Sequence, residues 1–181
     1  MRAANDRPYG GIATLSLCIS LCERKCSILD YPIFYQGAEI GRVTVDPDGL
    51  YYRLTASAAE PGRGVWRLWA CVGEESRLIG VLFPETGGLR LEKRISRRAW
   101  PILPDGFVLG REREGFRPWR GVFEGQEVSD AMLRRSADDA RTLAVFAPPE
   151  GPVPLAEYVT QMREAEIDGR PCLLPDLPQT P

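Results

Sequence analysis

Arginine and aromatic side chains are concentrated in residues 90–120 of the sequence. This segment has nine basic and four acidic side chains, whereas the whole chain has a net charge of −2. Because arginines neutralise phosphates and aromatic rings stack on bases, the composition predicts a surface for single-stranded nucleic acid. The predicted contacts are Arg97, Arg98, Trp100, Arg111, Arg113, Arg117, Trp119 and Arg120.

The order of charges within this segment favours a different interpretation. The signs alternate in Arg111-Glu112-Arg113-Glu114, a pattern typical of a solvated loop with internal ion pairs rather than of a continuous row of phosphate contacts. The acidic overall balance and the lack of a known nucleic-acid-binding motif point the same way. Nucleic acid therefore stays an alternative partner.

Two further aromatic residues, Tyr51 and Trp69, lie on predicted strand faces that also carry arginines. These strands are predicted to be neighbours, so the two rings would form a surface that could receive a sugar, a peptide or a protein. The alternative is that both rings belong to the core of a β-sandwich.

The chain contains no histidine, and this absence excludes several classes of reaction. Ser-His-Asp and Cys-His relays and histidine-bearing zinc sites all need an imidazole. Acid–base chemistry would fall mainly to carboxylates, and a convergent pair of them could support glycan hydrolysis. The carboxylates available for such a pair are Glu74, Glu75, Glu85, Glu92, Asp105 and Glu124.

Covalent and cofactor chemistry have little support in the sequence. Lys25 and Lys93 are the only lysines, and no histidine could activate Cys71, so Cys71 is predicted to be a buried, unreactive thiol. The paired glycines fall in strand-to-strand turns and lack the strand-to-helix setting that phosphate loops require. We predict no catalytic residue, no cofactor and no metal ligand.

The elements that would position these residues are mostly strands. Alternation of apolar and polar residues dominates from Asp30 onward and is broken by turns such as Asp46-Pro47-Asp48-Gly49. Short turns permit only antiparallel neighbours, so the pattern predicts a five-stranded meander within a β-sandwich or a partly open barrel. Two strands carry apolar residues on both faces and must be covered by the rest of the chain. The predicted strands are 42–45, 50–57, 65–72, 78–83 and 89–96.

A mixed region follows the corner Trp100-Pro101-Ile102-Leu103-Pro104. Short strands are predicted at 107–109, 122–123 and 142–147. Ser129 or Asp130 could cap a short helix that ends at Arg141, and a second helical stripe is formed by Leu155, Tyr158, Val159 and Met162. A hairpin through Asp168-Gly169, with 172–174 as its return strand, is the alternative to this second helix. The predicted fold is therefore mainly β with one or two short C-terminal helices.

The organisation predicted along the chain is an N-terminal extension (1–28), one β-rich domain (29–174) and a frayed tail (175–181). No run of 18 apolar residues is present, so no membrane-spanning segment is predicted. A weak secretion signal near the N-terminus is the alternative to a cytoplasmic location. The functional expectation is a binding or interaction module for an unknown protein, small-molecule or glycan ligand in the cytoplasm of a bacterium-like cell. A nucleic-acid binder and a carboxylate-dependent glycan enzyme are the alternatives.

Overall fold

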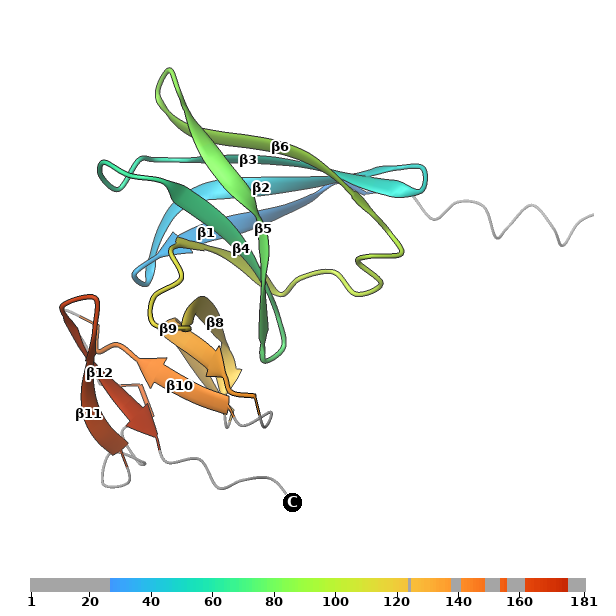
Figure 1. Ribbon diagram of the computed structural model, residues 1–181. Helices are drawn as coiled ribbons and strands as arrows, with labels where there is room; N and C mark the ends of the chain where they lie inside the picture. Colours follow the sequence, from blue (N-terminus) through green and yellow to red (C-terminus); the bar gives the residue numbers. More distant parts are fainter. Residues whose placement is uncertain (1–26, 124, 138–140, 149–153, 156–161, 176–181) are drawn as a thin grey trace, which may run out of the picture.

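The computed structural model describes residues 27–123, 125–137, 141–148, 154–155 and 162–175. Within these ranges the chain forms strands and connecting turns and no helix, and the strands build a barrel and a second sheet (Figure 1). The prediction of a mainly β fold is thus confirmed. No part of the described chain forms a helix of the length and apolar character needed to cross a membrane.

Seven strands close the barrel in the order β1-β2-β3-β6-β5-β4-β7. Neighbours along the barrel pair antiparallel except at the closure, where β1 and β7 pair parallel at Ile33–Phe107 and Phe34–Val108. The strands are β1 (Leu29–Tyr35), β2 (Ala38–Asp48), β3 (Tyr51–Ala58), β4 (Trp66–Val72), β5 (Glu75–Glu85), β6 (Gly88–Ser96) and β7 (Gly106–Gly110).

This strand order corrects the predicted meander. β3 pairs with β6 along its whole length, from Tyr51–Ser96 to Ala58–Leu89, whereas β4 lies between β5 and β7. Residues 59–65 are too many for a tight hairpin, which uses two to about five residues. They connect β3 to β4, which lies beyond β6 and β5 in the barrel order. The strands that bear Tyr51 and Trp69 are therefore not neighbours.

The barrel interior is filled by the inward-facing residues of all seven strands. Alternation along β2, β3 and β4 buries Val43, Val45, Leu54 and Leu68 completely. Trp100, from the connection between β6 and β7, joins this core and lies 6.5 Å from the ring of Tyr52 and 6.3 Å from that of Phe107. The predicted corner at 100–104 thus contributes an aromatic side chain to the barrel core.

The second sheet has the strand order β11-β12-β10-β9-β8 and contains the region in which helices were predicted. The helix from Ser129 or Asp130 to Arg141 is wrong, because residues 126–135 form a strand that pairs on both sides. Pairing with two neighbouring strands outweighs the local capping signal. The strands are β8 (Arg117–Phe123), β9 (Gln126–Arg135), β10 (Arg141–Val145), β11 (Met162–Ile167) and β12 (Arg170–Pro175).

The hairpin alternative at the C-terminal end is confirmed. β11 and β12 pair over six positions around a turn in which Asp168 and Gly169 both have positive φ, at 55° and 75°, as a two-residue hairpin turn requires. Met162, expected to end the second helix, instead begins β11, and residues 156–161 lie outside the described ranges. Most of the predicted extension and tail, residues 1–26 and 176–181, also lie outside them.

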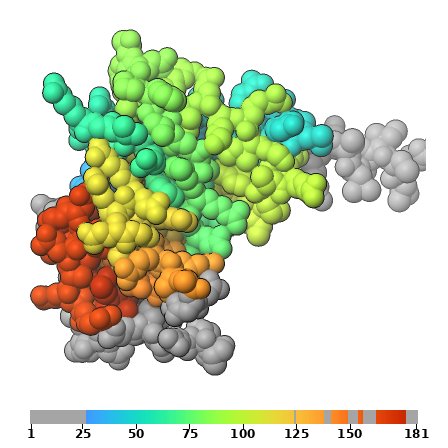
Figure 2. Space-filling model, viewed as in Figure 1, coloured from blue at the N-terminus to red at the C-terminus, as the bar shows by residue number. Residues whose placement is uncertain are grey.

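The second sheet packs against the outer face of the barrel at β4 and β7. In Figure 2 the atoms of the second sheet lie directly beside those of the barrel. Trp69, Cys71 and Val108 from the barrel share one apolar cluster with Trp119 and Leu143 from the sheet. The predicted cover for the second face of strand 65–72 is therefore present. The outer face of β5 is different, since Leu78 and Phe83 are 50% and 67% exposed.

Candidate functional site

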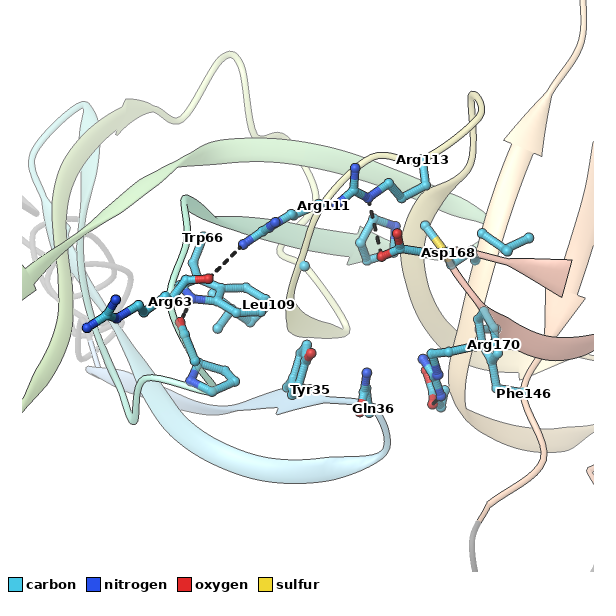
Figure 3. Close-up of a pocket in the computed structure, with 18 residues that line it drawn as sticks. Tyr35, Gln36, Arg63, Trp66, Leu109, Arg111, Arg113, Phe146, Asp168 and Arg170 are labelled. Carbon is cyan, nitrogen blue, oxygen red and sulfur yellow. Dashed lines mark hydrogen bonds and ion pairs between the residues drawn. The ribbon is translucent and has the colours of Figure 1, made fainter.

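A cleft of about 350 Å³ opens between the barrel and the second sheet (Figure 3). This volume lies within the range that small-molecule sites use. One wall comes from the β1–β2 turn and the loop before β4, the other from β9 and the β11–β12 hairpin, and the segment after β7 runs along its edge. Its principal lining side chains are Tyr35, Trp66, Leu109, Arg111, Arg113, Asp130, Phe146, Asp168 and Arg170.

The segment between β7 and β8 brings two arginines to this cleft. Arg111 and Arg113 both line it, whereas Glu112 between them is exposed and pairs with Arg117 at 3.8 Å. Arg113 is fixed by a β-bridge to Phe116. Alternate residues of an extended chain point to opposite sides. Arg111 and Arg113 therefore face the cleft, and Glu112 faces away from it.

Arg111 is held against the barrel wall. Its guanidinium lies 4.8 Å from the ring of Trp66, and its Nη2 donates to the carbonyl of Arg63 at 3.4 Å. A side chain at Gly64 would overlap this guanidinium, so the local backbone leaves room for it. The Nε atom is buried without a hydrogen-bond partner, and no carboxylate of the described residues forms an ion pair with Arg111.

The opposite wall carries two ion pairs of different quality. Arg170 Nη2 donates to Asp130 Oδ2 at 2.6 Å while its guanidinium stacks at 4.0 Å on Phe146. Arg113 Nε lies 3.3 Å from Asp168 Oδ2, but this Nε is buried without a hydrogen bond of acceptable geometry. Asp168 is 58% exposed, so the second pair is open to solvent and loosely held.

Apolar surface lies between these polar groups. Tyr35 and Trp66 meet edge to face with ring centroids 5.2 Å apart, and Trp66 Nε1 is already used, since it donates to the carbonyl of Gly62 at 2.8 Å. Tyr35 and Leu109 lie on the barrel side and Phe146 on the sheet side (Figure 3). The cleft therefore combines cationic side chains with some apolar surface on both sides.

The predicted aromatic site residues lie elsewhere. Trp69, Trp100 and Trp119 are buried, at 2%, 4% and 2% exposure, and the Nε1 of Trp69 donates to the carbonyl of Gly110 at 3.3 Å. Tyr51 is exposed on β3, where the guanidinium of Arg94 lies 4.6 Å from its ring. None of these four side chains lines the cleft.

The predicted arginine contacts are distributed over different elements. Arg97 lies 5.0 Å from the ring of Tyr52. Arg120 lies 3.6 Å from the ring of Phe34 and pairs with Glu127 at 2.8 Å. Arg98 and Arg117 are exposed. Among the predicted nucleic-acid contacts, Arg111 and Arg113 are the two that line the cleft.

The five described candidate carboxylates also lie outside the cleft. Glu85 and Glu92 both pair with Arg90, and Asp105 accepts a hydrogen bond from the Gly73 amide at 2.6 Å. Glu74 and Glu75 form ion pairs with neighbouring arginines, and Glu124 falls outside the described residues.

Neither cysteine of the described residues is activated. Cys71 is fully buried, as predicted, and burial raises the pKa of its thiol to about 11 despite the proximity of Arg120. Burial also raises the pKa of the Cys172 thiol. Both thiols therefore stay protonated near neutral pH.

One feature of the sequence, the alternating charges of residues 111–114, is related to the cleft. The alternation Arg111-Glu112-Arg113-Glu114 suggested a solvated loop, but in an extended segment beside a cleft it separates cations from acids. The opposite wall of the cleft was not predictable from the sequence. Asp130 belongs to a region in which a helix was predicted, and Arg170 belongs to a strand whose position in the sheet the sequence does not show.

Comparison with known proteins finds no matching family model, no matching curated protein and no matching solved structure. Among the described residues, no group of three or more histidine, cysteine or acidic side chains could hold a metal ion. Function is therefore inferred from the chemistry of the cleft itself.

Proposed function

We propose that this protein is a binding module and that the cleft between the barrel and the second sheet holds an anionic ligand. The observation that carries the proposal is that two weakly neutralised arginines line the cleft. Arg111 forms no ion pair with any carboxylate of the described residues, and Arg113 pairs at 3.3 Å with Asp168, which is 58% exposed. An oxyanion that enters the cleft would pair with the two guanidinium groups.

Arginine suits this role better than lysine would. Its planar group offers several donors in a fixed arrangement and binds carboxylate or phosphate through paired hydrogen bonds. The stacking of Arg111 on Trp66 restrains the guanidinium before a ligand arrives, so less side-chain entropy is lost on binding. Tyr35, Leu109 and Phe146 would contact the uncharged part of the ligand.

The proposed role is contact rather than bond cleavage. The charged groups of the cleft are arginines and two aspartates that are already ion-paired. We place the module in the cytoplasm of a bacterium-like cell. The free, buried thiols of Cys71 and Cys172 support this proposal, because unpaired cysteines are common in reducing compartments.

The test is a binding measurement with small organic anions. Isothermal titration calorimetry with phenyl phosphate and with benzoate should show saturable binding of at least one of them by the full chain. Arg111→Gln should weaken it by about 10- to 100-fold, because a hydrogen bond to a charged group contributes about 1.5–3 kcal/mol.

The matched control is Arg42→Gln on the outer barrel surface, where Arg42 is 70% exposed and pairs with Glu39 at 3.6 Å. It removes the same charge and should leave affinity within twofold. Equal losses in the two variants, or no binding of either anion, would refute the proposal.

A further inference from the structure

Of the four arginines that line the cleft, Arg111 and Arg113 are neutralised less firmly than Arg170. Arg170 is held by Asp130, whose side chain is only 18% exposed, through a 2.6 Å hydrogen bond. Asp168 is 58% exposed and makes no good hydrogen bond to the Nε of Arg113. An entering anion can therefore displace Asp168 into solvent, and Arg111 and Arg113 then present two positive charges.

We infer, on the basis of the proposed function, that the ligand is a dianionic phosphate monoester carried on a flat ring, such as an aryl or nucleoside phosphate. A carboxylate has two oxygens and one charge, which suit one guanidinium. A phosphate monoester has three terminal oxygens and up to two negative charges, so it can bridge two guanidinium groups and balance both. Arg111 and Arg113 line the same cleft from positions two apart in the chain, and the phosphate would lie between them.

The remaining lining favours a ring on the same ligand. Tyr35 and Leu109 lie on one side of the cleft, and Phe146 with the stacked guanidinium of Arg170 lies on the other (Figure 3). A flat body between these walls contacts apolar and stacked surfaces on both faces. The phosphate then points towards the segment that carries Arg111 and Arg113.

Because the chain has no histidine, the pH dependence of binding can report the charge of the ligand. An unperturbed imidazole is the only side chain that titrates between pH 5 and 8, and the chain has none. The charged and titratable groups that line the cleft are arginines, carboxylates and a tyrosine: Tyr35, Arg63, Arg111, Arg113, Asp130, Asp168 and Arg170. A pH dependence of binding in this range would therefore report the protonation of the ligand.

The experiment compares phenyl phosphate with benzoate by calorimetry at pH 5.0, 6.0 and 7.5 and at constant ionic strength. The second pKa of a phosphate monoester is about 6, so the dianion fraction rises roughly tenfold between pH 5.0 and 7.5. The affinity for phenyl phosphate should rise by about the same factor. Benzoate should bind at least tenfold more weakly at pH 7.5 and show no such rise.

A gain-of-affinity variant separates ligand binding from a folding defect. Asp168→Asn removes the acid that competes for Arg113, and asparagine tolerates the positive φ of this turn position. Its affinity for phenyl phosphate should rise about two- to fivefold, the equivalent of an exposed ion pair. Arg113→Gln should cancel this gain.

The outcomes distinguish the two proposals. Benzoate binding as tightly as phenyl phosphate, or a phenyl phosphate affinity that does not change with pH, would overturn the phosphate inference and leave the anion site standing. Asp168→Asn without a gain would also overturn it. Failure of both probes to bind would overturn the proposed function as well.

Discussion

Trp69 provides a demanding test of how the barrel and the second sheet are joined. The sequence left open whether this ring is a surface for ligands or a part of the core. In the structure it is 2% exposed and packs between the outer face of the barrel and the second sheet, with Trp119 and Leu143 in the same cluster. Trp69→Ala removes the largest barrel side chain from this contact.

The expected cost follows from burial. Truncating a buried tryptophan to alanine typically destabilises a protein by about 3–5 kcal/mol. The hydrogen bond from Nε1 to the carbonyl of Gly110 is long, at 3.3 Å, and adds at most about 1 kcal/mol. Since about 1 kcal/mol changes Tm by 2–4 °C in a chain of this size, the variant should melt roughly 6–24 °C below the parent.

Tyr51→Ala is the matched control. Its ring is 42% exposed and contacts the guanidinium of Arg94, so its loss should cost about 0.5–1 kcal/mol. Urea unfolding followed by far-ultraviolet circular dichroism gives both values. Equal destabilisation by the two substitutions would refute the packing of the second sheet on β4.

Two further predictions concern the thiol and the glycines of the barrel. Because the pKa of Cys71 is raised to about 11 in the folded chain from 9.0, the unfolded chain loses this proton first, so the free energy of unfolding should fall between pH 9 and 11 by up to ~1.4 kcal/mol per pH unit. Urea titrations at pH 8, 9.5 and 10.5 should show a smaller fall in Cys71→Ala; an equal fall would contradict the assignment. A Cβ on Gly41 would lie 2.2 Å from the carbonyl oxygen of Ser57, whereas one on Gly80 would meet only methyl groups of Leu91 at 3.4 Å. Gly41→Ala should therefore destabilise by about 1–3 kcal/mol and Gly80→Ala by clearly less, and the reverse order of thermal midpoints would be evidence against this barrel register.

Most strands of the barrel were predictable because each has one face in the core, but β1 was not among the predicted strands. Val43 and Val45 on β2 and Leu54 on β3 alternate with polar residues, and all three are fully buried. Their order was not predictable in the same way, because pairing depends on contacts between distant residues. The long connection at 59–65 was the available sign that β3 and β4 do not form a hairpin.

The second sheet shows where local signals fail. Ser129 and Asp130 can cap a helix, but cross-strand pairs such as Ala131 with Trp119 and with Val145 hold β9 as a strand. The Asp168-Gly169 turn was readable because it requires two positive φ values. Only the three-dimensional placement of this hairpin brings Asp168 to Arg113.

The central claim is that Arg111 and Arg113 offer guanidinium donors to an anion in the cleft. Proton–nitrogen correlation spectra of the arginine Nε–H groups observe these donors directly, and Arg111→Gln and Arg113→Gln assign the two signals. Added phenyl phosphate should shift both signals saturably and leave the Nε signal of Arg42, assigned in the same way, unchanged. Arg111 and Arg113 signals that stay in place at saturating phenyl phosphate, or that move no more than that of Arg42, would contradict the claim.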